Sequence, residues 1–128
     1  MSSKAPRGVI VGHGEFASGL LSAVKQICGR MDVFAAVSNR DYHAEELERI
    51  LREYVANGAE IIFTDLPGGS AATAARRVMR DNPKLVLVTG ANLAALLEFA
   101  LGEPCGPATA ARTAVEKGRS SMDSSGGE

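Results

Sequence analysis

Residues 7–27 read RGVIVGHGEFASGLLSAVKQI, and this stretch decides the fold. Residues 7–12 form a short apolar run with β-branched side chains that ends at a glycine, which is typical of a buried strand. From Phe16 onward, apolar side chains recur at helical spacing. A strand therefore leads into a helix through the segment GHGE, and His13 lies at that junction.

The same strand–helix pattern recurs along the rest of the chain. Four strand–helix units in succession predict an α/β fold, namely a doubly wound, mainly parallel four-stranded sheet with helices on both faces. The nearly continuous hydrophobic strands fit burial on both faces of that sheet. After the first unit, strands are expected at residues 32–38, 59–65 and 84–90, and helices at residues 44–58, 70–81 and 92–101.

Length and composition describe one domain. The chain has 128 residues, of which 45% are hydrophobic and 23% charged, so one sizeable core is expected but not two. A weakly amphipathic helix is expected after Gly106 and ends near Lys117. We therefore assign residues 1–117 to the domain and residues 118–128, which are rich in serine and glycine, to a disordered tail.

Charge and cysteine content argue against several classes of function. The 14 basic and 15 acidic side chains give a net charge of −1, which provides no electrostatic reason to bind nucleic acid or an anionic membrane. Cys28 and Cys105 lack the spacing of metal ligands and suit a reducing compartment, so a cytoplasmic protein is expected. No run approaches the roughly 20 apolar residues of a membrane span. We expect no nucleic acid, no direct membrane insertion and no metal.

Polar residues follow the predicted strands where a parallel sheet builds its sites, at the carboxyl ends. His13 follows the first strand, Asp65 the third, and residues 90–92 the fourth. If the first and third strands are neighbours, the Asp65 carboxylate can accept a hydrogen bond from one ring nitrogen of His13. The other ring nitrogen then keeps a lone pair, as a nucleophilic or ligating histidine requires.

Gly68, Gly69 and Ser70 open the third predicted helix. Free backbone N–H groups and the positive end of the helix dipole make such a start a seat for an anion. Together with His13 and Asp65, this seat predicts phosphoryl transfer through a phosphohistidine.

Each of these features also has a simpler interpretation. The histidine can be an ordinary loop residue, Asp65 can merely hydrogen-bond the following turn, and Ser70 can be a helix cap without a ligand. His43, in the segment NRDYHAEE, is expected on the surface. The coincidence of the three features is a stronger indication than any one of them.

Three segments together resemble a known family: IVGHGEFASGL, IIFTDLPGGS and LVTGANLAALLE. In order and spacing they are similar to the enzyme IIA components of the mannose-type (mannose/fructose/sorbose) sugar phosphotransferase system. The resemblance covers residues 7–101. It implies that the histidine-containing phosphocarrier protein phosphorylates His13, that Asp65 hydrogen-bonds this histidine, and that His13 passes the phosphoryl group to a IIB component. Gly68, Gly69 and Ser70 match the residues that seat the phosphate in that family.

The resemblance further implies a four-stranded parallel core, a homodimer as the common assembly, and no metal or cofactor. The chain departs from the family pattern after Ser70, where Ala71, Ala72 and Thr73 replace Pro-Phe-Asn or a close relative. Pro67 stands where an aromatic residue often precedes the glycine pair. We expect these positions near the partner-docking surface, which leaves two acceptors open: a IIB component, or a regulatory protein that senses the phosphorylation state. The sugar is not encoded in the residues.

Two other classes of function start from the same residues. GHGEFA, residues 12–17, fits the dinucleotide-binding fingerprint, and Arg40 could bind a 2′-phosphate, which describes a small NADP-binding Rossmann-like module. Such a short pattern recurs by chance, the chain is too short for two mononucleotide halves and a substrate domain, and Asp65 is left unused. A phosphate-independent interaction module is the third class.

Overall fold

Within residues 5–29, 32–40 and 42–127, which the computed structural model describes, four strands form one parallel sheet in the order β2-β1-β3-β4. The expected fold class is confirmed. The two central strands are buried along their whole length, whereas the edge strands are partly exposed, as the hydrophobic runs require. The strands are β1 (Gly8–Gly12), β2 (Phe34–Ser38), β3 (Ile61–Thr64) and β4 (Val86–Val88).

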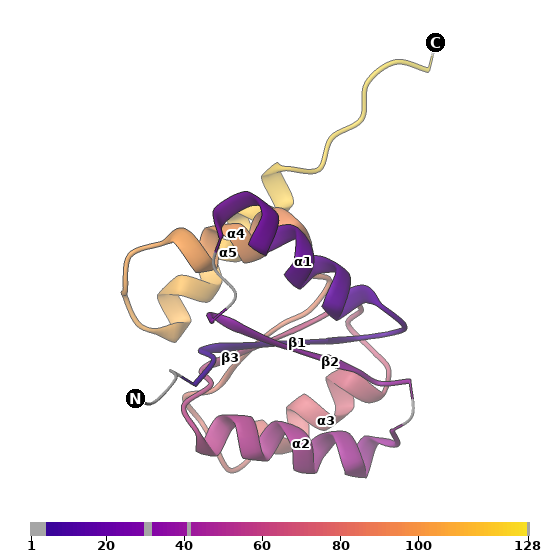
Figure 1. Cartoon of the computed structure of the whole chain (residues 1–128), viewed down its shortest axis with the longest axis vertical. Helices are drawn as coiled ribbons and strands as arrows, with labels where there is room; N and C mark the ends of the chain where they lie inside the picture. Colours follow the sequence, from indigo (N-terminus) through magenta and orange to yellow (C-terminus); the bar gives the residue numbers. More distant parts are fainter. Residues whose placement is uncertain (1–4, 30–31, 41, 128) are drawn as a thin grey trace.

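Helices cover both faces of the sheet (Figure 1). They are α1 (Phe16–Cys28), α2 (Ala44–Ala56), α3 (Ser70–Met79), α4 (Leu93–Leu101) and α5 (Pro107–Ser120). Helices α1, α4 and α5 lie on one face, and α2 and α3 on the other (Figure 1).

Each face of the sheet has its own apolar core. Ile10 on β1 packs into the core beneath α1, α4 and α5, whereas its neighbours Val9 and Val11 pack into the core above α2 and α3. This division follows from the strand geometry, because successive side chains point to opposite faces. In the first core the rings of Phe34, Phe63 and Phe99 lie with centroids 5.6–5.9 Å apart.

The register of β1 and β3 places the carboxyl ends of the two central strands side by side. Val11 pairs with Thr64, so the next residues along the chain, Gly12 and Asp65, lie level with each other. His13 follows one residue later. The fold itself therefore brings the loop that contains His13 next to the loop that contains Asp65.

The last helix extends further than the sequence analysis expected. Helix α5 ends at Ser120, so the domain boundary expected at residue 117 lies inside a helix, and residues 118–120 do not belong to a disordered tail. Gly118 is buried, and its carbonyl accepts a hydrogen bond from Asn92 Nδ2 at 2.9 Å. Asn92 Oδ1 in turn accepts from the Ala95 N–H and caps α4. The local sequence pattern does not predict this contact, because it joins two segments that are distant in the sequence.

We predict that Gly118→Ala lowers the free energy of unfolding by about 1–3 kcal/mol relative to Gly19→Ala, the usual cost of overpacking. A Cβ at position 118 would lie 2.9 Å from Asn92 Oδ1 and 3.1 Å from Ala95 Cβ, so α5 must shift away from α4. Gly19 is the matched control because a Cβ there meets nothing within 4 Å on its helix. Urea unfolding measures both variants, and equal stability would contradict the close contact of α4 and α5.

Candidate functional site

His13 and Asp65 are in direct contact at the carboxyl edge of the sheet. The ring Nδ1 lies 2.8 Å from Asp65 Oδ2, and the backbone N–H of His13 donates to the same oxygen at 2.9 Å. The predicted meeting of these two side chains across β1 and β3 is confirmed. The His13 side chain is 59% exposed, whereas that of Asp65 is only 13% exposed. The ring is therefore open to a partner while the carboxylate beside it is covered.

This contact selects the tautomer of the neutral imidazole. An ionised carboxylate only accepts hydrogen bonds, so the proton of the neutral ring belongs on Nδ1. Nε2, on the opposite side of the ring, then carries the lone pair. The arrangement provides an oriented, exposed nitrogen nucleophile at the end of β1.

The pKa of the Asp65 carboxyl lies below its ordinary value of 3.8. Partial burial acts to raise this pKa, but the hydrogen bonds from the backbone and the ring of His13, with the charge of the ring, together lower it by more. Asp65 is thus ionised at neutral pH and remains a hydrogen-bond acceptor for the ring.

The glycines on either side of His13 have structural roles. A Cβ at Gly12 would lie 2.6 Å from Phe16 Cδ2 and 2.9 Å from Asp65 Cγ, so only glycine lets the carboxyl group approach β1 this closely. Gly14 has φ +51°, in the left-handed region that favours glycine. Gly12 is therefore explained by the close approach of Asp65, and Gly14 by the left-handed turn after His13.

The start of α3 lies beside the imidazole. Gly69 precedes the helix with φ +95°, and a Cβ built there would lie 3.8 Å from His13 Cε1. Ser70 is the first residue of α3, whose first-turn N–H groups have no partner within the helix and favour an anion. The structure thus brings Gly69 to the histidine as expected, and Ser70 directly follows it. Gly68 is exposed, and nothing lies within 4 Å of a Cβ built there.

Two hydrogen bonds hold the loop between β3 and α3. The buried hydroxyl of Thr64 donates to the carbonyl of Leu66 at 2.9 Å, and Arg76 on α3 donates to the carbonyl of Pro67 at 3.0 Å. Leu66 is 54% exposed next to Asp65. The loop therefore exposes an apolar side chain directly after Asp65, on a backbone whose Leu66 and Pro67 carbonyls are both hydrogen-bonded.

The departure from the family pattern after Ser70 falls mostly inside the protein. Ala71 and Ala72 are 2% and 0% exposed, so their side chains are covered and cannot contact a partner, contrary to our expectation. Helix periodicity explains this, because the first turn of α3 already points its apolar face inward. Thr73 is exposed and Pro67 lies on the surface.

The loop after β2 also reaches the site. The sequence analysis did not include this loop among the residues expected to serve phosphoryl transfer. Asn39 Nδ2 donates to Ser70 Oγ at 3.2 Å. A Cβ at Gly14 would lie 3.7 Å from the guanidinium of Arg40, so this cation lies beside the histidine loop. The rule applied to the other strands would have found Asn39, since it directly follows a strand, but the sequence does not show that β2 is the neighbour of β1.

Other candidate residues lie elsewhere. Asn92, in the loop after β4, caps α4 and binds the carbonyl of Gly118 on α5. His43 is exposed before α2, where its N–H donates to Glu46 Oε1 at 2.9 Å.

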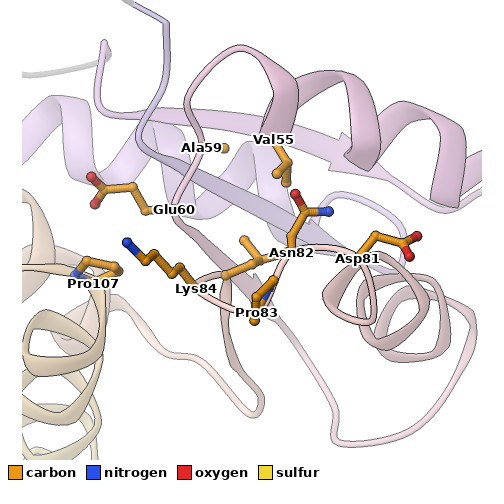
Figure 2. A pocket seen from close by; sticks show the side chains of 9 residues that line it. Val55, Ala59, Glu60, Asp81, Asn82, Pro83, Lys84 and Pro107 are labelled. Atoms are coloured by element: carbon orange, nitrogen blue, oxygen red, sulfur yellow. The ribbon is translucent and has the colours of Figure 1, made fainter.

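A hollow of about 510 Å³ opens at the opposite edge of the sheet (Figure 2). Glu60 and Leu85, which line it, directly precede β3 and β4, so it lies at the amino ends of the strands. His13 is at the carboxyl ends. In the described part of the chain, no three His, Cys, Asp or Glu side chains gather as a metal site would require.

The site is thus an exposed, carboxylate-oriented histidine at the carboxyl edge of a four-stranded parallel α/β sheet. The family model EIIA-man, described as the fructose IIA component of the phosphotransferase system (PTS), matches residues 8–114. The chain therefore belongs to this family, and the resemblance drawn from the three sequence segments is confirmed. The NADP-binding alternative is not supported.

Solved structures share the fold. The mannose/sorbose-specific IIA subunit of the phosphotransferase system from Enterococcus faecalis is 21% identical, with a TM-score of 0.81 and 96% of each chain covered. The PTS IIA protein associated with the fucose utilization operon of Streptococcus pneumoniae is 23% identical, with a TM-score of 0.79 over 97% of this chain and 96% of that chain. Comparison with curated proteins gives no match.

We predict that the Asp65 carboxyl titrates below pH 3.8 and that His13→Ala moves its pKa upward. The variant removes the hydrogen bond and charge of the ring but keeps the backbone N–H at position 13. Since the folded pKa is below the unfolded value of about 3.9, the stability from this contact is present above that pH and is lost as the pH falls through the folded pKa. Carboxyl-carbon NMR measures both titrations. An unchanged Asp65 pKa in His13→Ala would contradict the contact.

Proposed function

We propose that the chain is a phosphoryl carrier of a phosphoenolpyruvate-dependent sugar phosphotransferase system. His13 accepts the phosphoryl group from the histidine-containing phosphocarrier protein and passes it to a IIB component. The observation that carries this proposal is the 2.8 Å contact between His13 Nδ1 and Asp65 Oδ2, which leaves Nε2 free. Membership of the IIA family supports a role in sugar phosphotransfer.

The transfer exchanges one phosphorus–nitrogen bond for another. The Nε2 lone pair of His13 attacks the phosphorus of the phosphohistidine on the carrier, and the bond to the carrier's histidine breaks as the new bond forms. The leaving imidazole keeps its electron pair. Asp65 holds the Nδ1 proton and balances the positive charge that develops on the His13 ring. Little covalent help is needed, because phosphoryl transfer depends mainly on positioning and charge stabilisation.

The start of α3 supplies the complementary positive potential. In the proposed complex the Gly68 and Gly69 amides and the Ser70 hydroxyl donate to the phosphoryl oxygens. The first turn of α3 contains no acidic side chain that would repel the phosphoryl group. The phosphoryl group thus meets donors on one side and the oriented imidazole on the other.

The downstream acceptor is a IIB component rather than a regulatory protein in this proposal. Ala71 and Ala72 are buried, so the unusual sequence there changes packing beneath the site more than the surface that a IIB component would contact. The proposal also includes the cytoplasm as location and a homodimer as assembly, which are usual for this type of IIA component. Among the described helices, none has the length and apolar character needed to cross a membrane.

We predict that incubation with phosphoenolpyruvate, enzyme I and the phosphocarrier adds about 80 Da to the chain, the mass of one phosphoryl group. The label should be acid-labile and base-stable, as expected for a phosphohistidine, and intact-mass spectrometry detects it. His13→Ala abolishes the label because it removes the nucleophile. His43→Ala is the matched control and keeps it, since the chain has two histidines and His43 lies before α2. A histidine label that survives in His13→Ala would overturn the assignment.

We further predict that Asp65→Ala slows labelling by about 100-fold, the scale of losing one positioned catalytic contact. The fold is retained, because Asp65 lies in a loop after β3 and its side chain contacts the histidine rather than either core. Quenched-flow labelling gives the rate, and circular dichroism checks the fold. A variant that is folded and labelled at the full rate would remove Asp65 from the mechanism.

A further inference from the structure

The backbone of Asn39 is held in place independently of its side chain. Its N–H donates to the carbonyl of Gly12 at 3.0 Å, which continues the pairing of β1 and β2 one residue beyond Ser38. Its carbonyl accepts from the N–H of Tyr42 at 3.2 Å. Substitutions of the Asn39 side chain therefore leave these two backbone contacts intact.

The side chain of Asn39 connects the two loops that flank the histidine. Its Nδ2 donates to Ser70 Oγ at 3.2 Å across 31 residues of sequence. Strand β1, which leads to His13, lies between β2 and β3 in the sheet. The contact thus joins the end of β2 to the start of α3 on either side of the strand that carries the proposed nucleophile.

This contact determines how the Ser70 hydroxyl can be used. A serine hydroxyl has one proton and two lone pairs. When the amide of Asn39 donates to Oγ, the hydroxyl acts as acceptor on that side, and its single proton is available for another partner. A donated hydrogen bond also polarises the hydroxyl and strengthens it as a donor. A donor at the first residue of α3, beside His13, suits an anion.

We propose that Asn39 is a positioning residue for phosphoryl transfer, an inference that rests on the proposed function of His13. It acts through Ser70: the Asn39 amide holds the Ser70 hydroxyl so that its proton is donated to the phosphoryl group. Asn39 itself makes no contact with that group. An aspartate at position 39 would reverse the hydrogen bond, because a carboxylate only accepts and would draw the Ser70 proton away from the phosphoryl oxygens.

The test is a double-mutant cycle on the rate of phosphoryl transfer from the phosphorylated phosphocarrier to His13. We expect Ser70→Ala to slow transfer by about 100-fold, as for loss of one transition-state donor. Asn39→Ala should slow it by about 10-fold, as for loss of one hydrogen bond. The double variant should match Ser70→Ala within about twofold, since Asn39 acts only through Ser70. A double variant slowed by the product of the two factors, or an Asn39→Ala rate equal to that of the unaltered protein, would overturn the proposal.

The variant Asn39→Asp tests whether the side chain at position 39 orients the Ser70 hydroxyl or merely fills space. Its transfer should be slower than that of Asn39→Ala, and the difference between the two should shrink when Ser70 is also alanine, because no hydroxyl then remains to be turned. A difference of the same size with and without Ser70 would show only charge repulsion and would overturn the orienting role. Asn57→Asp is the matched control: Asn57 is an exposed amide at the end of α2 that donates to the Glu53 carbonyl, and its variant should transfer at the unaltered rate.

The possible failures are distinguishable. If the unaltered protein accepts no phosphoryl group on His13, the proposed function itself fails. If His13 is labelled but the effects of Asn39→Ala and Ser70→Ala multiply, only the role of Asn39 fails. Thermal unfolding of each variant accompanies the rates. Asn39→Ala should slow the single-turnover rate of labelling while all of the protein still becomes labelled, whereas a merely structural defect would reduce the fraction of protein that becomes labelled.

Discussion

One oxygen atom, Oδ2 of Asp65, accepts hydrogen bonds from both the ring and the backbone of His13. The imidazole is therefore fixed relative to its own main chain and to β3 at once. Two conditions make this possible: the parallel register that sets Gly12 level with Asp65, and the missing side chain at Gly12 itself. The site depends on the pairing of the two central strands, which are also the most deeply buried part of the sheet.

The same contact arranges the charges of the site. Asp65 lies on the Nδ1 side of the ring, away from Nε2, so its negative charge supports a positively charged imidazole without facing an anion bound at Nε2. The low pKa of the carboxyl keeps this charge in place. The start of α3, near the ring, and the guanidinium of Arg40, beside the histidine loop, add positive potential to the site. An anion is thus disfavoured on the Nδ1 side of the ring, where Asp65 lies.

The sequence was sufficient for the strands, because hydrophobic runs mark buried strands. It predicted the His13–Asp65 contact on the condition that the first and third strands are neighbours, because parallel strands gather their carboxyl ends. The part that could not be predicted depends on packing between distant segments. Asn39 joins the site only because β2 lies next to β1, an order that hydrophobic pattern does not specify. Helix α5 continues past residue 117, where Gly118 fits closely against Asn92, the N-cap of α4. The inward orientation of Ala71 and Ala72 required the position of α3 on the sheet.

Two helices begin close to His13, and the choice between them separates phosphoryl transfer from dinucleotide binding. Helix α1 starts after Glu15, an acidic side chain, and the N–H of Phe16 is already bonded to the carbonyl of His13 at 3.0 Å. An anionic diphosphate is disfavoured there, because it would meet a carboxylate and one fewer free donor. Helix α3 has no acidic residue in its first turn and begins at a serine whose hydroxyl is held by an amide. The start of α3 therefore favours an anion more than the start of α1 does, which agrees with the proposed phosphoryl transfer and not with dinucleotide binding.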